Sequence, residues 1–151
     1  MFRGIHAINL DPKGRLAVPT RYRERLEQDR EGSLILTIDT ESPCLLLYPV
    51  GEWEAIEVKL EALPSFNAAA RRIQRLLIGH ATELMLDGAG RVLLPPLLRT
   101  YAKLEKTVIF VGQGKKFEIW DEGTWQTNRD SWLTPSTDDS ELPADLKNLS
   151  L

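Results

Sequence analysis

The stretch Leu10-Asp11-Pro12-Lys13-Gly14-Arg15 decides the fold, because it occurs a second time as Leu86-Asp87-Gly88-Ala89-Gly90-Arg91. Each copy continues through apolar residues to a proline, and an arginine follows four residues later (Pro19 and Arg23; Pro95 and Arg99). Weaker matches follow in the apolar runs and in the positions of Trp53 and Trp125. A repeat of this length predicts that the chain contains two copies of one supersecondary unit.

The first copy has the pattern strand, turn, strand, short helix, strand, strand. Asp11-Pro12-Lys13-Gly14 has the composition of a tight turn, since Asp, Pro and Gly each favour a different turn position. Alternation and turn residues predict strands at 5–10, 15–18, 34–38 and 44–48, with a short helix over 20–28.

The second copy repeats this pattern with strands at 81–86, 91–94, 107–111 and 117–120 and a helix near 96–103. Two helices are expected between the copies. One lies within 49–64, and the next is capped by Ser65 and stopped at Gly79. Phe66 is expected on the apolar face of that second helix. Asp121 is expected to cap a C-terminal helix.

Four short strands cannot bury both of their faces alone, so the two copies are expected to interleave around one core. The fold class is therefore α+β with a mainly β core, barrel-like, with flanking helices and a pseudo-two-fold axis. A chain of 151 residues can build one such core. No apolar run approaches the roughly 18 residues of a membrane span, and the N-terminus lacks a signal-peptide pattern.

The net charge of −3 is unevenly distributed. Residues 1–25 contain six bases and two acids, or +4, whereas the tail from Thr134 is acidic. A basic N-terminal end inside an acidic chain keeps nucleic acid among the possible partners. Cys44 is the single cysteine and is expected to be a small core residue in a cytosolic protein.

Catalytic and metal-binding patterns are weak in this chain. His6 and His80 are the only histidines, and no acid or nucleophile stands at motif spacing from either. The run Gly112-Gln-Gly-Lys-Lys116 lies between two expected strands and reads as a hairpin turn rather than a phosphate loop. We therefore expect no enzyme activity, no cofactor, no metal site and no small-molecule substrate.

The repeated turn has two possible interpretations, one structural and one functional. It can be a purely structural turn in which Asp caps its own backbone and pairs with Arg. Yet Asp, Gly and Arg persist in both copies while the residues between them change, and a turn alone does not need Arg. An Asp that braces a guanidinium makes a preorganised fork for phosphate or a guanine edge. Arg71, Arg72 and Arg75, which are expected on one face of the second linking helix, also have two interpretations: a solvated helix face or a contact with a partner.

The chain resembles the MraZ family of bacterial transcriptional regulators over about residues 1–133. The resemblance rests on these segments: Met1-Phe-Arg-Gly, Asn9-Leu-Asp-x-Lys-Gly-Arg-Leu, Leu46-x-Tyr48-Pro49 with Glu52-Trp-Glu54, Arg71-Arg-x-Gln-Arg-Leu-Leu-x-Gly-His80, Asp87-x-x-Gly-Arg, Leu104-Glu-Lys and Phe117-Glu-Ile-Trp120.

This resemblance implies two SpoVT-AbrB units, at 5–50 and 81–124, which form a pseudo-dimeric swapped-hairpin barrel. Residues 51–80 would link them as a helical pair, and 125–133 would end the C-terminal helix. Outside the resemblance, the Ser, Thr, Asp and Pro content of residues 134–151 predicts an acidic, disordered tail. The resemblance also implies a ring-shaped homo-oligomer. Arg71, Arg72 and Arg75 are our candidates for the contact between subunits.

The implied function is sequence-specific binding of double-stranded DNA at short direct repeats in the promoter of the family's own division and cell wall operon, usually as a repressor. DNA contacts are expected first from Arg15 and Lys13, then from Arg3, then from Arg91. Asp11, Gly14, Asp87 and Gly90 are expected to orient the turns. The implied location is the cytoplasm, in association with the nucleoid.

Two other functions remain open at this point. The chain could be a ring-forming assembly protein whose basic turns bind another protein. It could also be an antitoxin of the AbrB type, whose tail neutralises a partner toxin.

Overall fold

The computed structural model describes residues 1–135 and 143–149. The first half of the chain contains β1 (Phe2–Asn9), β2 (Arg15–Ala17), α1 (Thr20–Gln28), η1 (Arg30–Gly32), β3 (Ser33–Ile38), β4 (Leu45–Pro49), α2 (Val50–Glu61) and α3 (Ala68–His80). The second half contains β5 (Thr82–Met85), β6 (Arg91–Leu93), α4 (Pro96–Tyr101), β7 (Thr107–Gly114), β8 (Lys116–Asp121), α5 (Glu122–Leu133) and α6 (Ala144–Lys147). The fold is thus α+β, built on a large antiparallel sheet.

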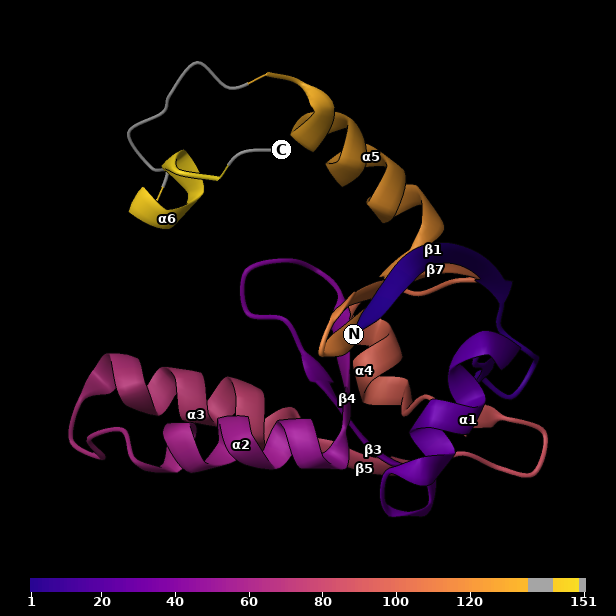
Figure 1. Cartoon of the computed structure of the whole chain (residues 1–151), viewed down its shortest axis with the longest axis horizontal. Helices are drawn as coiled ribbons and strands as arrows, with labels where there is room; N and C mark the ends of the chain where they lie inside the picture. The colour runs from indigo at the N-terminus through magenta and orange to yellow at the C-terminus, as the bar shows by residue number, and fades with distance from the viewer. Residues whose placement is uncertain (136–142, 150–151) are drawn as a thin grey trace.

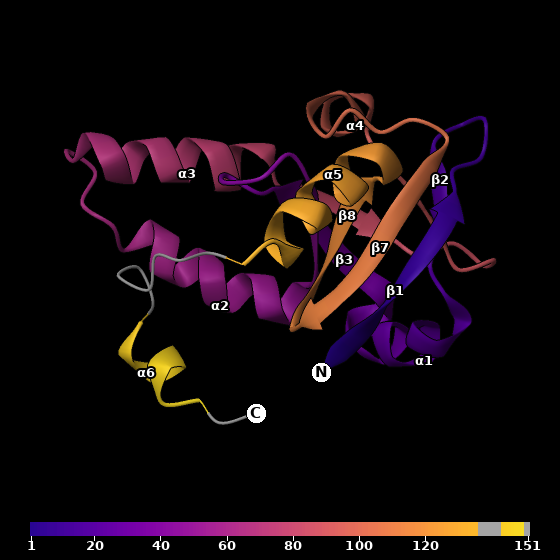
Figure 2. The same ribbon diagram turned by 90° about the horizontal axis from the view of Figure 1, so that it is seen from above.

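The two halves exchange strands. The six-stranded sheet has the order β1-β7-β8-β4-β3-β5, so the first strand of each half pairs with the third strand of the other half. The second strands, β2 and β6, pair with each other in a separate antiparallel ribbon. Figures 1 and 2 show β1 and β7 side by side along the sheet. The expected interleaving of the two copies is therefore present.

The six-stranded sheet is covered on both faces. Its inner face, with Leu36, Leu47 and Phe110, packs against the ribbon and against α1 and α4. The other face, with Tyr48 and Trp120, packs against residues of α2, α3 and α5. Strands buried on both faces need apolar residues at successive positions, which explains the continuous runs of β3 and β4.

The predicted barrel is not confirmed. Among the described residues the six-stranded sheet is open, with β1 and β5 at its edges, because β2 and β6 pair with each other and not with those edges. The ribbon is instead attached to the sheet through its buried residues Leu16 and Val92.

The helical pair between the halves differs from expectation at three residues. Asn67, not Ser65, caps α3, since its side chain accepts a hydrogen bond from the Ala70 N–H. Gly79 does not end the helix, which runs on to His80. Phe66 precedes α3 and is 91% exposed, so it is not on the buried face. Figure 1 shows α2 and α3 projecting together from the sheet.

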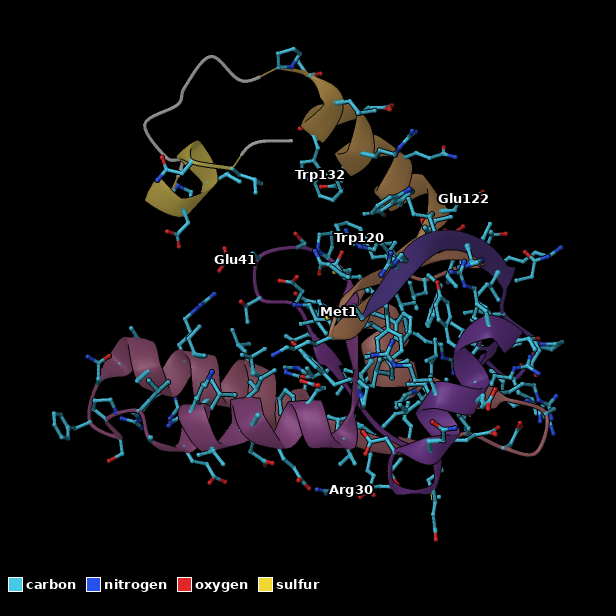
Figure 3. The ribbon with its side chains drawn as sticks, in the orientation of Figure 1. Met1, Arg30, Glu41, Trp120, Glu122 and Trp132 are labelled. Carbon is cyan, nitrogen blue, oxygen red and sulfur yellow. The ribbon has the colours of Figure 1, made fainter. Side chains whose placement is uncertain are left out.

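The C-terminal helix begins as expected, because the Asp121 carboxylate accepts hydrogen bonds from the Gly123 and Thr124 N–H groups. Trp132 lies near the end of α5, and the centroid of its ring is 5.6 Å from the ring centroids of Trp120 and Trp125. Figure 3 shows Trp132 on the side of α5 that faces Trp120. These aromatic contacts attach α5 to the sheet.

The expected disordered tail lies partly outside the described residues, at 136–142 and 150–151. The described part of the tail includes the short helix α6. Over the described ranges, no helix combines the length and the apolar character that a membrane crossing requires.

Candidate nucleic-acid interface

The first turn is organised by the side chain of Asp11. Its Oδ1 accepts hydrogen bonds from the backbone N–H groups of Lys13 and Arg15, at 3.0 and 2.8 Å. Its Oδ2 accepts from Arg15 Nε at 2.5 Å. The Gly14 N–H completes the turn by donating to the Asp11 carbonyl at 2.9 Å. One carboxylate therefore fixes both the turn and the arginine that ends it.

The second turn has the same geometry. Asp87 accepts from the N–H groups of Ala89 and Arg91, each at 2.9 Å, and from Arg91 Nε at 3.0 Å. The Gly90 N–H donates to the Asp87 carbonyl at 2.9 Å. Because the sequence repeats Asp, Gly and Arg at these positions, the same bonds form twice.

The backbone hydrogen bonds lower the pKa of both carboxyl groups. The Arg15 N–H is the largest cause at Asp11, and its side chain adds to the effect. The Arg91 N–H is the largest cause at Asp87. Both groups are therefore ionised near neutral pH. Each uses the Nε of its arginine, and within the described ranges the terminal Nη groups of Arg15 and Arg91 form no hydrogen bond with the chain. The two Nη groups of each guanidinium, with four N–H donors between them, are thus left for a ligand.

Gly14 and Gly90 are required by two independent constraints. Their φ angles are +84° and +74°, a region that side chains rarely adopt. A Cβ on Gly14 would also lie 2.6 Å from Cζ of Arg99, and one on Gly90 would collide with Arg23. The two glycines therefore let an arginine from the other half of the chain approach the turn.

These two arginines connect the halves reciprocally. Arg23 Nε donates to the Val18 carbonyl at 2.7 Å, and the Val18 N–H donates to the Gly90 carbonyl at 2.9 Å. In the other direction, Arg99 Nε donates to the Leu94 carbonyl at 3.0 Å, and the Leu94 N–H donates to the Gly14 carbonyl at 3.1 Å. Each turn is therefore built from both halves of the chain.

The ribbon between the turns brings their arginines together. Arg15 pairs with Leu93, and Ala17 pairs with Arg91. Leu16 and Val92 between them are buried, so these four side chains share the outer face of the ribbon. With strands about 4.8 Å apart and a rise of about 3.3 Å per residue, the Cα atoms of Arg15 and Arg91 are roughly 8 Å apart.

The other expected DNA contacts lie at different distances from this face. Lys13 is exposed in the first turn, where the second turn has Ala89. Arg3 is exposed on β1, eight residues before Asp11, so along an extended strand it lies about 26 Å from the turn. The structure groups Lys13, Arg15 and Arg91, and it separates Arg3 from them.

Arg71, Arg72 and Arg75 are exposed on α3. This helix belongs to the layer on the opposite face of the sheet from the ribbon. The candidate subunit contact and the candidate DNA contact are thus on different sides of the molecule.

Arg23 and Arg99 are functional residues of the turns for which the sequence alone predicted no role. Their signal was the repeated spacing of four residues after a proline. Each acts on the turn of the other copy, and this contact becomes visible only when β2 is paired with β6.

Asp39, Cys44 and Glu118 bring three potential metal ligands within 4.8 Å of one another. The Cys44 thiol is buried, and burial raises its pKa well above its ordinary value. A protonated thiol is a poor metal ligand, and its Sγ already contacts Asp39 Oδ2 at 3.8 Å. We assign Cys44 to the core, as the sequence predicts.

Comparisons with known proteins find the same family in both halves of the chain. The chain matches the family model "MraZ protein", which its description likens to antitoxins, at residues 1–76 and again at 77–141. It is 57% identical over 152 residues to the "Transcriptional regulator MraZ" of Legionella pneumophila strain Corby, covering all of both chains. Proteins of the same name from Coxiella burnetii strain RSA 493 and Thioalkalivibrio sulfidiphilus are 56% and 54% identical, again over the full length of both chains.

Proposed function

Because the chain belongs to the MraZ family, whose members compared above are named transcriptional regulators, we propose that it is a DNA-binding transcriptional regulator and that its β2–β6 ribbon is the DNA-binding element. The observation that carries the proposal is the pair of Asp-braced arginines on one outer face. Membership of this family also agrees with the expectation that the chain is not an enzyme.

The ribbon has the right dimensions for the major groove. A groove about 12 Å wide admits a two-stranded β-ribbon. Arg15 and Arg91 lie diagonally on the ribbon and keep their terminal nitrogens free of hydrogen bonds among the described residues. A fixed guanidinium can donate two hydrogen bonds to O6 and N7 of guanine or to a phosphate. We assign Arg15 and Arg91 to these contacts and Lys13 to a phosphate beside the first turn.

Arg23 and Arg99 pack against the two turns and so support the same surface. Their Nε atoms are bonded to the backbone, and their guanidinium groups lie against Gly90 and Gly14. They hold the turns in position and add positive charge close to the surface that would enter the major groove of DNA. Arg3, about 26 Å from the first turn, is assigned at most an outlying phosphate contact.

On this proposal, residues 5–50 and 81–124 are two AbrB-type units that form a pseudo-dimer. The ribbon covers the inner face of the open sheet, and the two together enclose a barrel-like core. The oligomer is a ring, in which exposed residues of α3, with Arg71, Arg72 and Arg75, meet the next subunit. A ring gains affinity when several ribbons meet evenly spaced direct repeats, since each further contact is intramolecular. The regulated promoter is that of the family's own division and cell wall operon, the effect is repression, and the protein works in the cytoplasm at the nucleoid.

Fluorescence anisotropy tests the DNA-binding surface. The probe is a promoter duplex with two direct repeats, compared with a scrambled duplex. We expect wild-type protein and Arg72→Ala to prefer the repeats, and Arg15→Ala to lose the preference while its oligomer mass is unchanged. Repeat-specific binding by Arg15→Ala would refute the assignment. Equal binding of both duplexes by the wild type would instead favour the assembly protein as the second candidate.

A further inference from the structure

The outer face of the ribbon contains an apolar side chain between the arginines. Leu93 is 54% exposed, although it lies in a strand and its neighbours Val92 and Leu94 are buried. It pairs directly with Arg15 across the ribbon. Leu93 therefore contributes little to the core, and its exposed side chain lies on the same outer face as Arg15 and Arg91.

Leu93 departs from the pseudo-two-fold symmetry of the ribbon, because the equivalent position is occupied by a smaller residue. Leu93 and Ala17 occupy equivalent positions, since Arg15 pairs with Leu93 and Arg91 pairs with Ala17. One end of the ribbon therefore presents an arginine with a leucine, and the other end presents an arginine with an alanine. The two ends of the ribbon therefore differ in apolar reach, in addition to the difference between Lys13 and Ala89 in the turns.

The charge around Leu93 selects the ligand. The cations of the ribbon and first turn are Arg15, Lys13 and Arg91, Arg99 lies against Gly14 of that turn, and the carboxylates there are already bonded to the turns. A polyanion with an apolar group on its accessible face fits such a surface. In the major groove that group is the C5-methyl of thymine, which differs from every hydrogen-bonding group of the base edges.

We propose that Leu93 contacts a thymine methyl group next to the base pair or phosphate bound by Arg15, so that the two ends of the ribbon read the DNA differently. The inference rests on the proposed function and extends it to specificity. Ala17 is too short to make the same contact beside Arg91. The preferred site is therefore asymmetric, with thymine favoured on the Leu93 side only.

The test replaces thymine by deoxyuridine, which removes the methyl group and keeps the base pairing. Anisotropy measures binding of the two-repeat promoter duplex in three forms: with thymine, with deoxyuridine in the repeats, and scrambled. The variants are Leu93→Ala, Leu93→Met, and Leu133→Ala as a matched loss of an exposed leucine, 65% exposed on α5.

Wild type, Leu93→Met and Leu133→Ala should bind the thymine duplex about three- to fivefold more tightly than the deoxyuridine duplex. Leu93→Ala should bind the two duplexes equally and still prefer both to the scrambled duplex. A full wild-type ratio in Leu93→Ala, or no ratio in the wild type, would overturn the proposal. So would a change of oligomer mass in Leu93→Ala with the ratio retained, which would assign Leu93 to a contact between copies.

Failure of the underlying function gives a different result. If wild-type protein binds the thymine duplex no better than the scrambled duplex, the DNA-binding function itself is wrong. If it prefers the repeats but ignores the methyl groups, only the role of Leu93 is wrong.

Discussion

The guanidinium of Arg23 lies against the Cα of Gly90, so a residue of the first half of the chain occupies the space beside the turn of the second half. The contact related to it by the pseudo-two-fold axis places the Arg99 guanidinium against Gly14. Together with the β2–β6 pairing, these contacts make the two turns one rigid unit. Each turn therefore packs against an arginine from the other half.

Replacement of Gly90 tests this packing, and Gly88 in the same turn is its control. A Cβ at Gly90 meets Arg23 and requires a positive φ, whereas a Cβ at Gly88 meets nothing within 4 Å. We expect Gly90→Ala to lower the free energy of unfolding by about 1–3 kcal/mol. Gly88→Ala should change it by less than about 0.5 kcal/mol. Urea titration followed by circular dichroism measures both, and equal effects would contradict the packing.

The sign of the effect of Asp11→Asn distinguishes positioning from charge. If Asp11 only added negative charge near DNA, its neutralisation would strengthen binding. Because its Oδ2 holds Arg15 Nε, we expect Asp11→Asn to weaken repeat-specific binding roughly tenfold. Anisotropy with the promoter duplex measures this. Tighter binding by Asp11→Asn would rule out the bracing role.

Lys13 and Ala89 occupy corresponding positions in the two turns, and exchanging their charge tests phosphate contact. Lys13→Ala should reduce the slope of log K against log salt concentration by about one per bound chain. Ala89→Lys should increase it by about one, because it gives the second turn the charge of the first. Unchanged slopes in both variants would place Lys13 away from the phosphates.

The lowered pKa values of Asp11 and Asp87 predict how the turns respond to acid. Each folded-state pKa lies below its ordinary value of 3.8, so the stabilisation is complete above that value and is lost as the pH falls through the folded-state pKa. The turns should therefore be insensitive to pH between 5 and 8.

Carboxyl-carbon NMR titration measures the two midpoints directly. In Arg15→Ala the Asp11 midpoint should rise and yet stay below the ordinary value, because the backbone N–H at position 15 is the largest cause of the shift. An ordinary midpoint for Asp11 in the wild-type protein would contradict the hydrogen bonds of the turn.

The repeat in the sequence was sufficient to predict the two turns, the strands around them and the interleaving of the halves. Asp, Gly and Arg are local determinants, since their bonds span four residues at most. The contacts of Arg23 and Arg99 could not be predicted in the same way, because they depend on which strands pair across the two halves. The predicted barrel was not confirmed, because β2 and β6 pair with each other as a separate ribbon.

The ends of the second linking helix illustrate a different limit. Ser65 and Asn67 both favour the cap position, and only the position of the chain after Pro64 decides that Asn67 is used. Gly79 is compatible with a helix end, but it does not adopt the positive φ of a C-terminal stop, and the helix ends one residue later, at His80.

Hydrogen–deuterium exchange with and without the promoter duplex tests the central claim most directly. If the turns and ribbon form the DNA-binding surface, DNA should slow amide exchange in peptides that cover residues 11–17 and 87–93. Exchange in α3, residues 68–80, should be unchanged at constant oligomer mass. Protection confined to α3 or α5, with none at the two turns, would contradict the account.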